Sequence, residues 1–122
     1  MSVSTCATTY ISNYSFGRVT INGRSYCSDL LITCRGVRDQ WRRRTGHSLC
    51  VEDLHEILQE SPDILVVGTG LHGRMQIPQA TELELSSRGI EIRCLRTTEA
   101  VAEFNRLQQR DASVAAALHL TC

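Results

Sequence analysis

Asp63-Ile-Leu-Val-Val67 is followed directly by Gly68-Thr-Gly-Leu-His-Gly73. A short, continuous apolar run that ends at glycines is typical of a strand buried on both faces of a sheet. Strands of that kind occur where helices cover both sides of the sheet. The stretch therefore predicts an α/β fold, with this strand at the centre and the glycines in a turn at its carboxyl end.

Helix and strand patterns alternate downstream of this turn. A proline suits the first position of a helix, and a glycine suits the left-handed position just after its end. The downstream elements that we expect are a helix that begins at Pro78 and ends near Arg88-Gly89, a strand over 90–95, a helix that begins at Thr97 with the apolar stripe Ala100, Val101, Phe104 and Leu107, and a strand over 113–118.

Upstream, the dipeptide Asn22-Gly23 is a strong signal for a hairpin turn. The upstream elements that we expect are a hairpin within 16–26, a return strand that continues through Leu30, Leu31 and Ile32, a loop over 34–46, and a helix capped by Ser48 and ended by Ser61-Pro62. Together these elements predict a compact three-layer α/β domain. It has a mixed central β-sheet, helices on both faces and an N-terminal β-hairpin.

The length of 122 residues allows one hydrophobic core but not two. We therefore predict a single domain over 16–122, after a loose or edge segment over 1–15. No apolar run approaches the roughly 20 residues that span a bilayer, and the net charge of zero argues against a general nucleic-acid binder. The N-terminus shows no secretory signal, so the six cysteines are expected to be reduced thiols in a cytoplasmic protein.

The stretch 68–73 matches G-x-G-x-x-G, in which glycines let the backbone approach a pyrophosphate at a helix N-terminus. The context does not fit a dinucleotide site, because the next helix is expected only at Pro78. No cofactor is predicted. The carboxyl end of a central strand is still where α/β sheets bind ligands. Candidate residues for a small anionic ligand are therefore Gly68, Thr69, Gly70 and Arg74.

Residues 35–44 hold five arginines and one aspartate, a net charge of +4 within a neutral chain. One interpretation is a site for an anion or an acidic partner, with Trp41 as an aromatic surface and Arg42, Arg43 and His47 beside it. The other is a solvated loop whose arginines pair with acidic helices. Nucleic acid is not the expected partner, because this stretch lacks a recognition helix or an aromatic series.

His47-x-x-Cys50 and His119-x-x-Cys122 repeat one spacing. If the two motifs meet in space, they offer two imidazoles and two thiols, which suit tetrahedral zinc. Neither motif has the C-x-x-C spacing of a structural zinc site, so no metal is predicted. No hydrolase motif of the G-x-S-x-G or H-E-x-x-H type occurs, and no catalytic residue is predicted.

Four stretches carry a family resemblance: Ile64-Leu-Val-Val-Gly-Thr-Gly70, Gly89-Ile-Glu-Ile-Arg93, Thr97-x-x-Ala100-x-x-x-Phe104-Asn105-x-Leu107 and Val114-x-x-Ala-Leu-His119. In this order and spacing they resemble the Mth-domain family over residues 15–122, most specifically from residue 63 onward. The resemblance implies a three-layer α/β domain with a mixed sheet and no agreed enzymatic activity or cofactor. It also makes Thr97 and Asn105 candidates for a site near the 68–70 turn, although a helix cap and a hydrogen bond to a loop are their ordinary roles.

Relatives in that family act through protein association or assembly, as far as the resemblance implies. We therefore expect a non-enzymatic interaction or assembly module, monomeric or weakly homodimeric, whose partner is another protein. The alternative is a binder of, or an enzyme acting on, a small anionic ligand where the 68–70 turn faces the 41–47 loop. An exposed interaction patch would favour the first hypothesis, and a concave pocket at that turn would favour the second.

Overall fold

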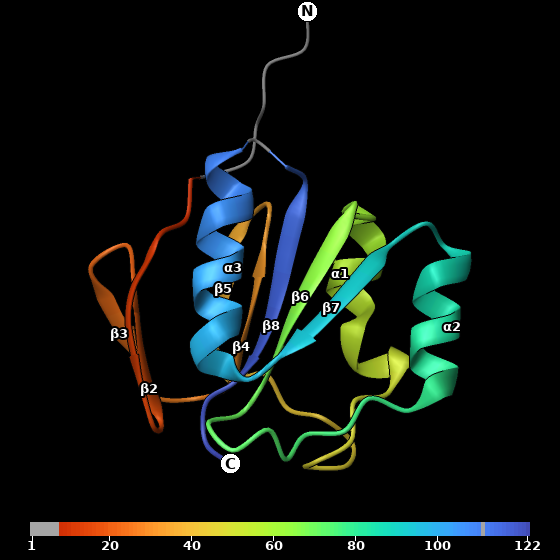
Figure 1. The fold of residues 1–122 in the computed structure, drawn as a ribbon, viewed down its shortest axis with the longest axis horizontal. Helices are drawn as coiled ribbons and strands as arrows, with labels where there is room; N and C mark the ends of the chain where they lie inside the picture. The colour runs from red at the N-terminus through yellow and green to blue at the C-terminus, as the bar shows by residue number, and fades with distance from the viewer. Residues whose placement is uncertain (1–7, 111) are drawn as a thin grey trace, which may run out of the picture.

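The computed structural model describes residues 8–110 and 112–122 (Figure 1). Its strands are β1 (Ile11–Ser15), β2 (Arg18–Ile21), β3 (Arg24–Tyr26), β4 (Leu30–Thr33), β5 (Gly36–Arg38), β6 (Ile64–Thr69), β7 (Glu91–Leu95) and β8 (Val114–His119). Its helices are the 3-10 helix η1 (Val51–Leu54), α1 (His55–Glu60), α2 (Gln79–Ser87) and α3 (Thr97–Gln109). The strands form a five-stranded sheet of order β5-β4-β8-β6-β7 and a three-stranded sheet of order β1-β2-β3.

The predicted central strand is confirmed. Strand β6 pairs in parallel with β7 on one side and with β8 on the other, so that Val67 lies opposite Cys94 and Ala117. Strand β4 pairs with β8 in the antiparallel sense, and β5 completes the mixed sheet as an antiparallel edge strand. Both faces of β6 are buried after its first residue, which explains why the run is apolar throughout.

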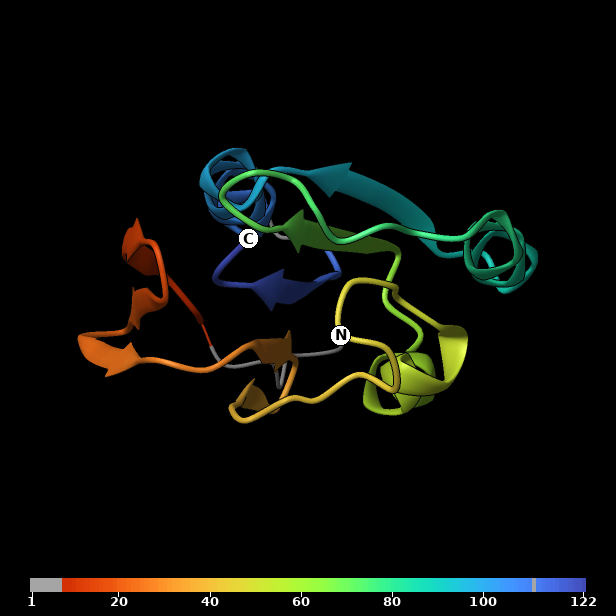
Figure 2. The same ribbon diagram turned by 90° about the horizontal axis from the view of Figure 1, so that it is seen from below.

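Helix α3 and the small sheet cover one face of the large sheet, and α1 and α2 lie on the other (Figure 2). Alternate residues of β8 serve the two cores. Ala116 packs in the core that contains Phe104 of α3, whereas Ala115 and Ala117 belong to the core that contains Leu85 of α2. The small side chain of Ala116 faces α3, and the three-layer α/β fold is confirmed.

The hairpin at Asn22-Gly23 is confirmed, because β2 and β3 pair in the antiparallel sense around it. The predicted continuation of the return strand is wrong. Strand β3 ends at Tyr26, and β4 begins at Leu30 in the other sheet. The chain leaves the small sheet here because the Asp29 carboxylate accepts the backbone N–H of Leu120 at 2.8 Å, which ties this segment to the end of β8.

Two further details differ from the sequence prediction. Strand β5 lies within the stretch 34–46 that we expected to be a loop, because three residues are too few to show a strand periodicity. The helix that we expected to be capped by Ser48 begins as η1 at Val51 with Cys50 as its N-cap. Asp53 supplies the acceptor there, since its carboxylate takes the Cys50 N–H at 3.0 Å.

The segment 1–15 is described only in part. Residues 1–7 lie outside the described residues, whereas β1 is an edge strand of the small sheet. The side chain of Ile11 is buried in the core, so at least this end of the segment packs against the domain. The boundary at residue 16 stays a prediction. In the part of the chain that the structure describes, no helix is long and apolar enough to cross a membrane.

The expectation that all cysteines are reduced is wrong for Cys34, which is disulfide-bonded. Cys34 lies in the turn between β4 and β5, half-buried, rather than within the packed core where a free thiol acts as a small apolar group. The free cysteines among the described residues are Cys27, Cys50, Cys94 and Cys122, and Cys6 lies outside them.

Candidate functional site

The carboxyl ends of β6 and β8 lie side by side, with Thr69 opposite His119. The connection from β6 to β7 runs through α2 on one face, and the connection from β7 back to β8 runs through α3 on the other. Open α/β sheets bind ligands outside the strand ends at such a topological switch point. The sequence predicts that the candidate residues lie around this point. The contacts that each of them makes determine which ligands the site can bind.

The glycines of the 68–70 turn make room for the protein's own chain. A Cβ on Gly68 would lie 2.8 Å from Thr97 Oγ1 and 3.0 Å from a methyl carbon of Leu118. A Cβ on Gly70 would lie 2.2 Å from the carbonyl carbon of Cys122, and the φ angle of Gly70 is +106°. Packing within the chain is therefore enough to require glycine at both positions, and phosphate binding is not needed to explain them.

The backbone donors of this turn are also used within the chain. The Gly70 N–H donates to Thr97 Oγ1 at 2.8 Å, and the Leu71 N–H donates to the Thr121 carbonyl at 2.7 Å. The Arg74 N–H donates to the Cys122 carbonyl at 3.0 Å. The next helix is α2, which begins at Gln79. The N–H groups of Gly70, Leu71 and Arg74 are therefore not free to bind a pyrophosphate, and the motif lacks the immediate helix that a dinucleotide site needs.

Thr97 is fully buried and bridges the two strand ends. Its hydroxyl accepts from Gly70 and donates to the His119 carbonyl at 2.6 Å. The expectation that Thr97 caps α3 is wrong, because Arg96 is the N-cap residue and Thr97 is the first residue of the helix. Its side chain is directed into the sheet, where two backbone groups need a partner.

Three charged or polar side chains meet beside this bridge, and we call Asp29, Arg43 and His119 the β8-end cluster. Asp29 Oδ2 lies 2.8 Å from His119 Nδ1 and 2.8 Å from Arg43 Nη1, and Arg43 Nη2 lies 3.2 Å from His119 Nδ1. Burial alone would raise the pKa of Asp29. Hydrogen bonds from His119, the Leu120 N–H and Arg43 outweigh burial and lower that pKa below its ordinary value.

His119 Nε2 is the one buried side-chain nitrogen or oxygen within residues 8–110 and 112–122 that has no hydrogen-bond partner. The imidazole ring of His47 packs against the His119 ring, with 5.6 Å between ring centres and planes at 80°. His47 itself is exposed to solvent, whereas His119 is only 4% exposed. An exposed imidazole thus covers a buried one at the carboxyl end of the sheet.

The 41–47 loop reaches this site, but not all of its residues face it. Trp41 is 7% exposed and donates its indole N–H to the Asp53 carbonyl at 2.8 Å, so it is a core residue rather than a surface platform. Arg43 stacks over the Trp41 ring and also donates to the Gly46 carbonyl, which uses its guanidinium internally. Only Arg42 and His47 of the predicted loop residues are exposed.

The remaining candidates lie apart or serve other contacts. Arg74 is exposed on the turn, and Thr69 donates its hydroxyl to the Leu95 carbonyl at 3.0 Å. Asn105 is not near the turn: its side-chain amide donates to the Ile11 carbonyl and accepts the Ile11 N–H, which holds β1 against α3. Sequence reasoning missed Asp29, although a carboxylate directly before the apolar strand β4 was a usable signal.

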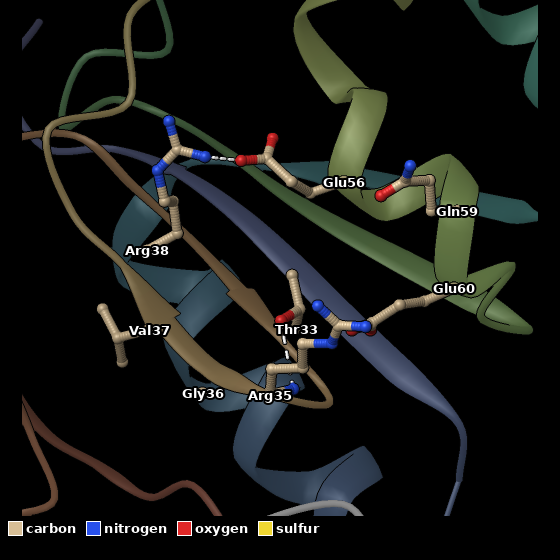
Figure 3. A pocket seen from close by; sticks show the side chains of 8 residues that line it. All are labelled: Thr33, Arg35, Gly36, Val37, Arg38, Glu56, Gln59 and Glu60. Atoms are coloured by element: carbon tan, nitrogen blue, oxygen red, sulfur yellow. Dashed lines mark hydrogen bonds and ion pairs between the residues drawn. The ribbon is translucent and has the colours of Figure 1, made fainter.

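A separate pocket of about 340 Å³ lies between the β4–β5 hairpin and α1 (Figure 3). We call it the β5 pocket; its lining residues are Thr33, Arg35, Gly36, Val37, Arg38, Glu56, Gln59 and Glu60. Arg38 forms an ion pair with Glu56 across it, and Glu60 accepts the Cys34 N–H at 2.7 Å. None of the candidate residues from the sequence lines this pocket.

Few side chains that could bind a metal ion meet at the carboxyl ends of β6 and β8. Within the described ranges, no group of three or more His, Cys, Asp or Glu side chains is placed to hold a metal ion. The two His-x-x-Cys motifs nevertheless converge in part, because the rings of His47 and His119 are in contact. The zinc arrangement considered from the sequence is therefore present only as two imidazoles.

Comparison with known proteins supports the fold and gives no activity. Residues 11–119 match a family model described as a protein of unknown function (DUF498/DUF598). The solved structure named MT938 is similar, with a TM-score of 0.78, 29% identity and coverage of 93% of this chain and 99% of that chain. A structure from Bartonella henselae, described as an outer membrane protein, has a TM-score of 0.82, 25% identity and coverage of 95% and 98%.

A Bordetella pertussis protein described as a Mth938-like domain has a TM-score of 0.72 at 16% identity, and the match covers 98% of this chain and 89% of that chain. At that identity the likeness is one of fold. The resemblance to the Mth-domain family that the sequence motifs indicated is confirmed by these matches.

Proposed function

The chain belongs to the DUF498/DUF598 family of proteins of unknown function, and on that premise we propose that it is a non-enzymatic interaction module. Its partner is an extended segment of another protein, which adds a strand to β5. The observation that carries this proposal is the edge of β5, which pairs only with β4 among the described strands and lies directly beside the β5 pocket. Strand addition at a sheet edge is a common way to bind peptides, because main-chain hydrogen bonds supply affinity and side-chain pockets supply specificity.

The edge of β5 presents backbone groups that can pair. Among the described strands, β5 pairs only with β4. The hairpin has a two-residue turn, with Thr33 opposite Gly36, so these two residues form the hydrogen-bonded pair that closes it. Hydrogen-bonded and non-hydrogen-bonded pairs alternate along an antiparallel ladder. The N–H and C=O of Val37 are therefore directed away from β4, toward an incoming strand.

The β5 pocket lies where alternate side chains of an added strand would enter. Figure 3 shows Arg38 of β5 and Glu56 of α1 directed toward each other across it. The Arg38 side chain is 61% exposed, and an exposed ion pair contributes at most about 1 kcal/mol. A partner's charged side chain can therefore displace this pair at little cost.

The alternative, a small anionic ligand at the 68–70 turn, has less support. Its binding would need backbone N–H groups that Thr97, Thr121 and Cys122 already accept. The guanidinium of Arg43 is likewise engaged by Asp29 and Gly46. We therefore favour the interaction hypothesis over the ligand hypothesis.

The test selects short peptides on the purified protein from a random display library and measures their binding by fluorescence anisotropy. Val37→Pro removes the outward N–H of β5 and leaves its bonds to β4. Ser25→Pro is the matched control, because the same register argument directs the Ser25 N–H of edge strand β3 outward. We expect Val37→Pro to weaken binding at least tenfold and Ser25→Pro to leave it unchanged. Failure to select any peptide, or binding that Val37→Pro does not affect, would refute the proposal.

A further inference from the structure

The two His-x-x-Cys motifs are not used by the proposed interaction surface, yet the fold brings their histidines together. His47 comes from the loop before η1, and His119 ends β8. Their rings are in contact at the carboxyl end of the large sheet, at the topological switch point. The chemistry of this imidazole pair can be derived from the surrounding contacts, independently of what binds β5.

The contact with Asp29 determines which ring nitrogen of His119 carries the proton. Nδ1 lies 2.8 Å from Asp29 Oδ2 and 3.2 Å from Arg43 Nη2. An ionised carboxylate only accepts, and it makes the shorter contact, so the proton is assigned to Nδ1 and shared with Asp29. The neutral ring then carries a lone pair on Nε2.

That lone pair is buried and has no donor among the described residues. A buried acceptor left without a partner costs about 1–3 kcal/mol. A carboxylate on one imidazole nitrogen with the other nitrogen open is the usual surrounding of a metal-binding histidine, because the carboxylate orients the ring and raises its basicity. Asp29 has this position relative to His119.

The distance between the two rings is close to the distance that a shared ion would require. Two imidazoles that bind one tetrahedral ion at about 2.0–2.1 Å have ring centres roughly 5 Å apart. The centres of His47 and His119 are 5.6 Å apart, and their planes cross at 80°. A shift of the exposed His47 side chain by less than about 1 Å satisfies this distance.

We propose that His119 Nε2 and the His47 imidazole bind a divalent transition-metal ion of the zinc class. Imidazole nitrogen suits zinc, nickel and copper and does not suit calcium or magnesium. No third protein ligand completes the group within the described residues, so water or a bound molecule fills the open positions. Asp29 is a positioning residue, because it acts through the His119 ring.

The test titrates zinc into protein that has been freed of metal with a chelator, by calorimetry. We expect one equivalent to bind, His47→Ala to weaken binding at least tenfold and His55→Ala to leave it unchanged. His55 is an exposed histidine at the start of α1 and controls for adventitious surface binding. Absence of binding, or binding that His47→Ala does not reduce, would overturn the proposal.

Two spectroscopic readings do not depend on a His119 variant that could fail to fold. Imidazole ¹⁵N spectra should show the proton on Nδ1 of His119 before zinc is added, and a shift of the Nε2 signal after it is added. Cobalt serves as the coloured probe for the thiols. An intense thiolate-to-cobalt band that Cys122→Ser removes would assign the ion to cysteine and overturn the histidine site.

Discussion

The carboxyl end of the large sheet and its β5 edge differ in how their polar groups are used. At the carboxyl end, the turn donors, Thr97 and the guanidinium of Arg43 are bonded within the chain. At the β5 edge, Arg38 and Glu56 form a partly exposed ion pair, and β5 pairs only with β4 among the described strands. The glycine motif that looked most like a ligand site therefore holds the protein together, whereas the β5 edge contributes fewer contacts to the fold among the described residues. Variants at the two places should differ accordingly in stability.

The largest loss is expected for Gly70→Ala. The new Cβ would overlap the backbone of Cys122 at 2.2 Å and would occupy a residue with φ +106°. Strain and overpacking together should lower the free energy of unfolding by about 3 kcal/mol or more. Gly46→Ala is the matched control, since nothing lies within 4 Å of a Cβ there. Urea unfolding at 25 °C measures both, and equal stability of the two variants would contradict the close-packed turn.

Asp29→Ala should rank second. It leaves Arg43 and His119 buried without the carboxylate that both contact, and breaking a buried pair on one side costs about 3 kcal/mol. The control is Glu84→Ala, which removes an exposed ion pair with Arg88 and should cost less than about 0.5 kcal/mol. Unfolding curves for the two variants that coincide would show that the β8-end cluster does not stabilise the fold.

Thr97→Val should follow, because it keeps the shape of the side chain and removes two hydrogen bonds. The Gly70 N–H and the His119 carbonyl then lose their buried partner, which should cost about 2 kcal/mol. Thr98→Val at the next, exposed position of α3 is the control for helix propensity. A loss no greater than that of the control would mean that other groups satisfy these backbone atoms.

The pH dependence of stability tests the same cluster without altering its size. Burial raises the pKa of Asp29, but hydrogen bonds from His119, the Leu120 N–H and Arg43 lower it overall. A carboxyl group with a lowered folded pKa stabilises the protein above its unfolded pKa of about 3.9, and this contribution is lost as the pH falls through the folded value. The stability of the wild type should therefore fall more steeply below about pH 4 than that of Asp29→Asn. Parallel curves would exclude this contribution.

The sequence predicted the sheet well because its evidence is local. The run 63–67 and the stripe of α3 show burial directly through apolar residues. The surroundings of Gly70 could not be predicted in the same way, since Cys122 is distant in sequence and its approach is a tertiary contact. Asp29 lies where the chain passes from β3 in the small sheet to β4 in the large sheet, and nothing in the local sequence pattern showed that change of sheet.

The smallest effect is expected at the β5 pocket. Arg38→Ala removes the partner of Glu56, but the Arg38 side chain is 61% exposed, so the free energy of unfolding should change by less than about 0.5 kcal/mol. Lys keeps the positive charge of Arg but lacks its planar guanidinium. Arg38→Lys therefore separates the effect of charge from that of side-chain shape in the same measurement. We expect the isolated protein to tolerate both changes, because the Arg38 side chain is mostly exposed. A loss above about 2 kcal/mol for Arg38→Ala would instead place this edge among the elements that hold the fold together, and the contrast with the carboxyl end would disappear.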